Sequence, residues 1–84
     1  MKNEDQLQLE AATFRRLVKH LQQNTDLQNI DLMNLAGFCR NCLSKWMTEE
    51  AKSMDIELDY EESRNKVYGM SYSLWKEKFQ KPIK

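Results

Sequence analysis

A hydrophobic stripe over residues 31–54 constrains the fold of this chain more than any other feature of its sequence. Apolar residues recur there at three- and four-residue steps, the spacing that gives an α-helix one buried face. Because the stripe keeps its phase across Gly37, we predict one long helix from about Asp31 to Met54, with the glycine permitting close approach of another helix. The alternative is a break at Gly37 and a new helix from Phe38. The stripe consists of Leu32, Leu35, Ala36, Cys39, Cys42, Leu43, Trp46 and Met47.

A second stripe with the same spacing predicts a helix from about Asp5 to Gln23. A polar stretch then interrupts the pattern. Thr25 and Gln28 fit a capping box there, and Asp31 is a second candidate cap, so we expect a short helical turn over residues 26–29. The stripe of this first helix consists of Leu7, Ala11, Phe14, Val18 and Leu21, and Leu17 widens it.

Two short helices are predicted in the carboxyl half of the chain. Asp59 with Glu62 is an N-cap signature, and Gly69 is suited to end the helix that follows it. Ser71 then caps a last helix, which Pro82 closes.

These elements together predict an all-α fold in one domain over residues 1–84. The expected arrangement is a compact four-helix domain, in which two long helices form an antiparallel hairpin and two short carboxyl-terminal helices pack across it. In the connector before the third helix, Ile56 and Leu58 should lie against the core.

Charge and composition exclude several classes of protein. Thirteen basic and thirteen acidic residues give zero net charge, whereas nucleic-acid binders usually carry a basic excess. A helix-turn-helix over residues 25–46 would present only Arg40, Asn41 and Lys45 to DNA, so we do not expect a nucleic-acid partner. No run approaches the roughly 18 apolar residues of a membrane span, and the polar amino end is unlike a secretory signal. With only two cysteines, these features predict a cytoplasmic protein away from the membrane.

The pair Cys39 and Cys42 is the feature that bears most directly on chemistry. On a helix, three-residue spacing places both sulfurs on one face. Inside the predicted long helix the dipole does not activate a thiol, and no strand precedes the pair, so a thioredoxin-like assignment is disfavoured and both cysteines are expected to be core residues. A break at Gly37 would place Cys39 near a helix amino end and favour a redox pair.

A metal site at these cysteines would need further ligands. A closed zinc site takes four, and His20 is the only histidine of the chain. In the predicted hairpin, His20 does not reach the level of Cys39 along the helix axis. Asp31 or a water molecule would have to be the fourth ligand. We therefore expect no cofactor, and zinc or iron held by Cys39, Cys42 and His20 is the alternative.

No residue pattern indicates catalysis, and the aromatic residues indicate an interface instead. The adjacent carboxylates at 49–50 and 61–62 point in different directions on a helix and form no dyad. Large aromatic side chains, by contrast, exceed what two short helices can bury, which predicts a homodimer or another homo-oligomer. We therefore expect a non-enzymatic interaction module. The aromatic residues are Trp46, Tyr60, Tyr68, Tyr72, Trp75 and Phe79, with Phe38 beside the long helical stripe.

Three sequence motifs resemble those of a family of short proteobacterial proteins known only as a domain of unknown function. They are Phe38-Cys39-Arg40-Asn41-Cys42-Leu43 ahead of Trp46, Val67-Tyr68-Gly69-Met70 followed by Tyr72 and Trp75-Lys76, and the preceding stretch from Asn29 to Gly37. The resemblance extends from about Phe14 to Gln80. It implies a small helical fold and a bacterial cytosolic protein, and it supplies no activity, substrate or catalytic residue.

Overall fold

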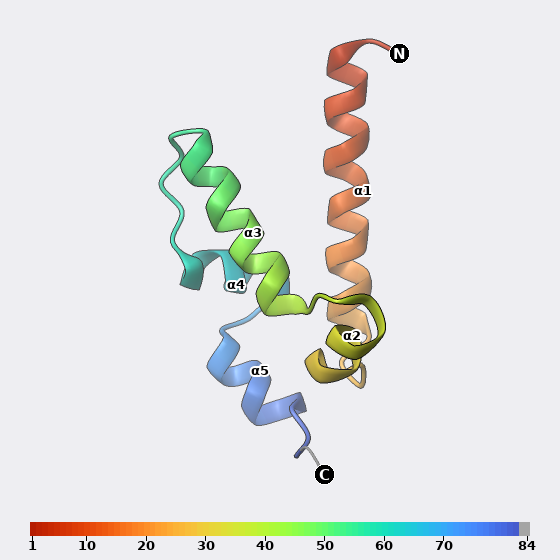
Figure 1. Ribbon diagram of the computed structural model, residues 1–84, viewed down its shortest axis with the longest axis vertical. Helices are drawn as coiled ribbons and strands as arrows, with labels where there is room; N and C mark the ends of the chain where they lie inside the picture. Colours follow the sequence, from red (N-terminus) through yellow and green to blue (C-terminus); the bar gives the residue numbers. More distant parts are fainter. Residues whose placement is uncertain (83–84) are drawn as a thin grey trace.

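The computed structural model describes residues 1–82, which form five helices and no strand (Figure 1). The all-α prediction is confirmed. The four-helix arrangement is wrong, because the long second helix is two helices separated at Gly37. The helices are α1 (Asn3–Gln23), α2 (Asn29–Ala36), α3 (Arg40–Ser53), α4 (Tyr60–Tyr68) and α5 (Tyr72–Phe79).

The break between α2 and α3 depends on the backbone conformation of Gly37. This residue has φ 75°, in the left-handed region that glycine adopts without strain, and its N–H donates to the carbonyl of Met33 to end α2. Cys39 is extended, with φ −140°, and is the N-cap of α3. The stripe runs on across the break in sequence, but on α2 only Leu32 of the stripe is buried and Leu35 is 84% exposed. Periodicity alone therefore does not reveal the break.

The chain reversal between α1 and α2 also differs from the prediction. Residues 25–27 form a non-helical turn, so the helical turn expected at 26–29 is absent. The capping box at the start of α2 joins Gln28 to Asp31, whose Oδ2 accepts the N–H of Gln28 at 3.1 Å. The predicted box between Thr25 and Gln28 is wrong by three residues.

The caps of the two short helices are confirmed. The Asp59 side chain accepts the N–H of Glu62 at 2.8 Å, and Gly69, at φ 75°, ends α4 in the left-handed conformation. The Ser71 hydroxyl accepts the N–H of Leu74 at 3.2 Å. Each of these signals acts within one helical turn, which is why the sequence alone locates them.

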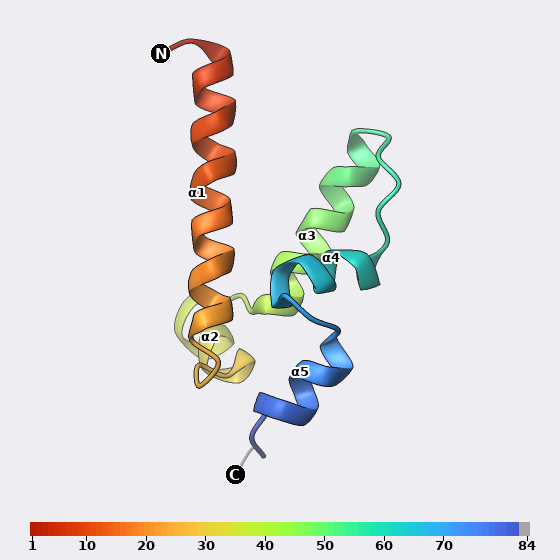
Figure 2. The ribbon, with the colours of Figure 1, turned by 180° about the vertical axis from the view of Figure 1, so that it is seen from behind.

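The central helix of the fold is α4, although it has only nine residues. It packs against α3, α1 and α5. The helices α1 and α3 do not form the predicted antiparallel hairpin: they draw apart toward the top of the view, and α4 crosses the lower part of α3 (Figure 2). Thr48 of α3 and Ser63 of α4 share a hydrogen bond of 2.7 Å where the two helices meet. The Gln22 side chain of α1 donates to the carbonyls of Lys66 and Val67 at the end of α4.

The core is small and largely aromatic around α5. Trp75 is buried and lies edge-on to Tyr68, with 5.2 Å between ring centroids. The connector before α4 contributes less than predicted, because Ile56 is 53% exposed and Leu58 only half-buried. The buried cluster consists of Leu21, Leu32, Cys39, Leu43, Val67, Tyr68 and Trp75.

A fully buried arginine, Arg40, joins the ends of three helices. Its Nη1 donates to the carbonyl of Leu27 and its Nη2 to the carbonyls of Leu21 and Asn24, at 2.6, 3.1 and 2.9 Å. Nη1 also donates to Oδ1 of Asn29 at 3.2 Å. The guanidinium lies over the ring of Trp75, 4.9 Å from its centroid. Within residues 1–82 no carboxylate pairs with Arg40, so carbonyl dipoles, including those at the negative end of α1, balance its charge.

Replacing Arg40 with methionine is expected to lower the free energy of unfolding by about 3 kcal/mol or more, because three buried carbonyls lose their donor. Chemical denaturation followed by circular dichroism measures the loss. Arg16→Met, on the exposed surface of α1, is the matched control and should change stability by no more than about 0.5 kcal/mol. Equal effects of the two substitutions would contradict the role given to Arg40.

Candidate functional site

The two cysteines lie at the amino end of α3. Cys39 is the N-cap and Cys42 stands three residues on, and their sulfurs are 3.4 Å apart. Both are free thiols. An N-cap side chain turns back over the first helical turn, which is why this spacing brings the sulfurs together. The sequence alternative with a break at Gly37 is therefore correct, and the thiols do not lie inside a helix as the long-helix prediction required.

The two thiols differ in their surroundings. Cys39 is 8% exposed, whereas Cys42 is only half-buried. Burial raises the pKa of the Cys39 thiol, and the backbone N–H groups of Cys42 and Asn41, which lower that pKa, do not cancel the effect. At neutral pH Cys39 is therefore a protonated thiol, and Cys42 is the sulfur that meets solvent.

The two residues between the cysteines anchor the site to the rest of the fold. Arg40 donates to the carbonyls of Leu21, Asn24 and Leu27, which we call the carbonyl cage. Asn41 accepts a hydrogen bond from the Tyr68 hydroxyl at 2.8 Å. Asn29 of α2 donates to the same hydroxyl at 3.0 Å and accepts the backbone N–H of Arg40 at 3.2 Å. This polar network of Asn29, Arg40, Asn41 and Tyr68 fixes the position of both cysteines. No local pattern indicates this role of Asn29, which the sequence marks only by its place in a motif.

His20 does not join the cysteines. It lies exposed in the last turn of α1, where its carbonyl accepts the N–H of Asn24. Asp31, the other ligand considered, serves the capping box of α2. Across residues 1–82, no group of three or more His, Cys, Asp and Glu side chains comes together in a way that would hold a metal ion.

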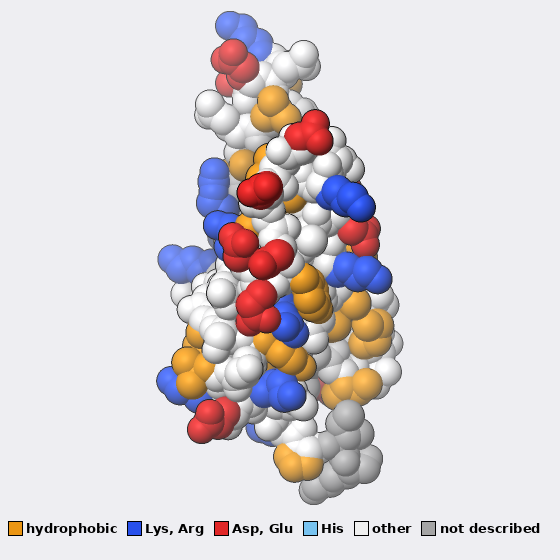
Figure 3. Space-filling view, turned by 90° about the vertical axis from the view of Figure 1, so that its left-hand side faces the viewer, with side chains coloured by type: hydrophobic (Ala, Val, Ile, Leu, Met, Phe, Trp, Pro, Cys, Tyr) orange, Lys and Arg blue, Asp and Glu red, His pale blue; other side chains and the backbone are white. Residues whose placement is uncertain are grey.

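The residues considered for DNA contact are not presented together. Arg40 is buried, Asn41 is half-buried and bonded to Tyr68, and only Lys45 is exposed. The face shown in Figure 3 mixes acidic, basic and hydrophobic side chains.

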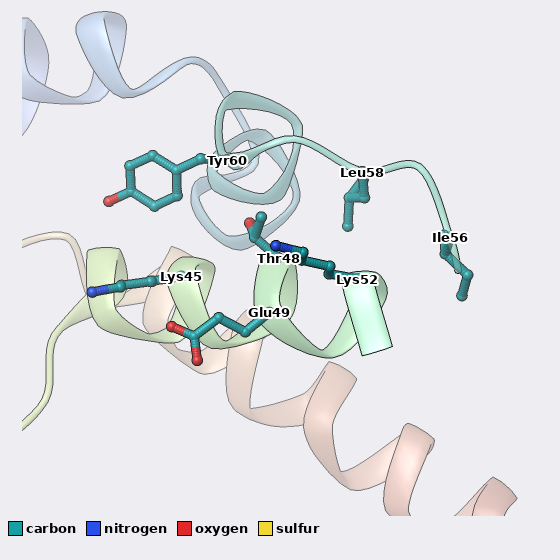
Figure 4. Close-up of a pocket in the computed structure, with 7 residues that line it drawn as sticks. All are labelled: Lys45, Thr48, Glu49, Lys52, Ile56, Leu58 and Tyr60. Carbon is teal, nitrogen blue, oxygen red and sulfur yellow. The ribbon is translucent and has the colours of Figure 1, made fainter. Parts of the chain in front are cut away.

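Two hollows lie against α3. One, of about 650 Å³, lies between the outer face of α3 and the connector to α4 (Figure 4). Its α3 side presents Lys45, Glu49 and Lys52, and its other side is apolar. The other, of about 390 Å³, lies between α1 and α3 and reaches α4; we call it the α1–α3 groove. It is lined by Phe14, Arg15, Val18, Lys19, Gln22, Met47 and Lys66.

The model of a family described as "Protein of unknown function (DUF1244)" matches residues 27–84, which is more than half of the chain. The chain belongs to the DUF1244 family. The resemblance drawn from the cysteine and tyrosine motifs is thereby confirmed. No curated protein matches the chain.

The DUF1244 match covers both cysteines and the whole polar network around them, and it begins after α1. No helix within residues 1–82 is long and apolar enough to cross a membrane.

The stability of this DUF1244 protein is expected to fall as pH rises above about 9. Burial raises the pKa of Cys39 from 9.0 and that of Tyr68 from 10.0. The folded state therefore holds these protons more tightly than the unfolded state, so their contribution is complete below pH 9 and is lost at higher pH. Denaturant unfolding between pH 8.5 and about 10 measures the decline. Cys39→Ser should reduce the slope, and Cys42→Ser is the matched control. An identical slope in all three proteins would contradict the assignment to Cys39.

Proposed function

We propose that this DUF1244 protein is a non-enzymatic self-association module that forms a homodimer through α1. The observation that supports it is the amino half of α1, whose apolar stripe is not covered by any other part of residues 1–82. Every residue from 1 to 13 is exposed, and this half of the helix projects away from the other helices (Figures 1 and 2). Leu7 is 66% exposed, whereas Leu21, on the same stripe, is 2% exposed.

The aromatic residues, from which the sequence analysis predicted an interface, are weaker evidence for self-association than the exposed half of α1. Tyr68 and Trp75 are buried, and Tyr72 and Phe79 are half-buried in contact with them. Trp46 remains half exposed, stacked against Phe38. Most of the aromatic surface is therefore used within one chain, while the amino half of the α1 stripe is not.

The proposed contact of α1 is with α1 of a second copy, lying antiparallel to it in the α1–α3 groove. Leu7, Ala11, Phe14 and Val18 follow steps of four, three and four residues, the spacing of a coiled-coil seam. In an antiparallel pair Leu7 lies opposite Val18 of the second copy. Ala11 then lies opposite Phe14 of the second copy. A two-fold rotation axis relates the two sides of this contact, so both copies use the same surface of α1. Because that surface is then occupied in both copies, the assembly closes as a dimer.

The charges of α1 favour this antiparallel direction. The amino half carries Glu4, Asp5 and Glu10, whereas the groove is lined by Arg15 and Lys19 together with Lys66 of α4. The antiparallel register brings the acidic amino half of each helix alongside the basic carboxyl half of the other. A parallel pair would oppose like charges along its whole length, so the charge pattern selects the direction of pairing.

Leu7→Asp is expected to raise the dimer dissociation constant by about 100-fold or more, because each dimer loses two buried leucines at about 1.5–3 kcal/mol each. Sedimentation velocity over a concentration series measures the constant. Leu9→Asp is the matched control: Leu9 is 53% exposed on the opposite side of the same helix and should leave the constant unchanged. A wild-type protein that stays monomeric at every concentration, or an equal effect of Leu9→Asp, would contradict the proposal.

Charge reversal tests the direction of pairing. Glu10→Arg and Arg15→Glu should each weaken the dimer, since each reduces the charge complementarity between the acidic half of one helix and the basic half of the other. The double variant restores opposite charges and should recover most of the lost affinity. Additive weakening in the double variant would contradict the antiparallel register.

A further inference from the structure

The thiol pair at the amino end of α3 has no part in the proposed contact of α1. We propose that Cys39 and Cys42 are a reversible dithiol–disulfide site, oxidised by exchange with the disulfide of a low-molecular-weight thiol. This inference is independent of the proposed dimer, because neither cysteine lies on α1 or lines the α1–α3 groove.

The distance between the sulfurs is short enough for a bond to form without rearranging the fold. They are 3.4 Å apart, and a disulfide bond is about 2.05 Å long, so the sulfurs need to approach by only about 1.4 Å. Cys39 is the N-cap and has an extended backbone, so its side chain is not confined to the direction that a helical residue imposes. The break at Gly37 is therefore what permits this geometry.

The neighbours of the pair hold it in place in either oxidation state. Arg40 and Asn41 are bonded to the carbonyl cage and to the Tyr68 hydroxyl, and neither contact uses a sulfur atom. The backbone between the cysteines is therefore held in place as the bond forms and breaks.

The difference in exposure sets the order of the reaction. Cys42, the more exposed thiol, loses its proton to water and its thiolate attacks one sulfur of the small disulfide. A bond forms from Cys42 to that sulfur, and the other half leaves as a thiolate with the bonding electron pair. Cys39 then loses its proton and attacks the sulfur of Cys42, which expels the second small thiolate. Both leaving thiolates take up protons, so the two cysteines lose two electrons and two protons in total and one small disulfide becomes two thiols.

Mass spectrometry of the folded full chain after incubation with oxidised glutathione tests the site. Acid quenching and alkylation with iodoacetamide follow the incubation. The expected product is a monomer lighter by two hydrogens, which carries neither glutathione nor alkyl groups and returns to the dithiol with dithiothreitol. A product that forms only after the protein is unfolded with urea, or that links two chains, would overturn the proposal.

Two single-cysteine variants test the order of attack. Cys39→Ser should stop at a mixed disulfide of Cys42 with glutathione. Cys42→Ser should form the corresponding adduct at Cys39 at least about tenfold more slowly, because that thiol is buried and protonated. Near-ultraviolet circular dichroism checks that both variants keep the fold. Equal rates in two folded variants would overturn the assignment of Cys42 as the attacking thiol, and the absence of an adduct in both would overturn the site.

Discussion

The burial of the Arg40 guanidinium is the interaction on which the rest of this structure depends. Three backbone carbonyls and one amide oxygen surround it, and the ring of Trp75 covers it. These acceptors come from the end of α1, the turn after it and the start of α2, while the arginine is the first residue of α3. One side chain thus sets where α1 stops, how the chain reverses and where α3 begins.

The cysteine motif combines two tasks in four residues. Its inner residues, Arg40 and Asn41, point into the molecule and hold α3 against the other helices. Its outer residues, Cys39 and Cys42, meet at the helix end with their sulfurs in contact. A DUF1244 protein that keeps the inner pair therefore keeps the position of the outer pair, and the chemistry of the thiols rests on a structural anchor next to them in sequence.

The extent to which the sequence predicted this structure follows from the range of each interaction. Asp59, Ser71 and Gly69 act on neighbouring residues, so their helix ends were predictable from local pattern. The break at Gly37 remained one of two alternatives, because the stripe keeps its phase across the glycine. The hydrogen bonds from Arg40 to carbonyls between 13 and 19 residues earlier, which hold the start of α3 in place, leave no trace in local pattern. Hydrophobic periodicity indicates which side of a helix is apolar. It does not reveal a polar side chain whose hydrogen bonds go to backbone carbonyls far away in the sequence.

At the candidate site, too, the local pattern was predictable and the long-range arrangement was not. The spacing of Cys39 and Cys42 placed them on one face, but whether that face lay inside a helix or at its end depended on the break at Gly37. The exposure of the amino half of α1 was equally hidden, since its stripe is continuous with the part that packs in the core. Only the arrangement of helices in space shows where the core stops along that stripe.

The cage around Arg40 has a consequence for how this protein tolerates change. Three of its four acceptors are main-chain oxygens, which every amino acid supplies alike. The cage therefore requires that α1 end at the right place, and it does not depend on which side chains stand at residues 24 and 27. At this joint the first helix is held through its backbone, so the residues on its outer surface are free to diverge, and to acquire a different partner, without loosening the joint.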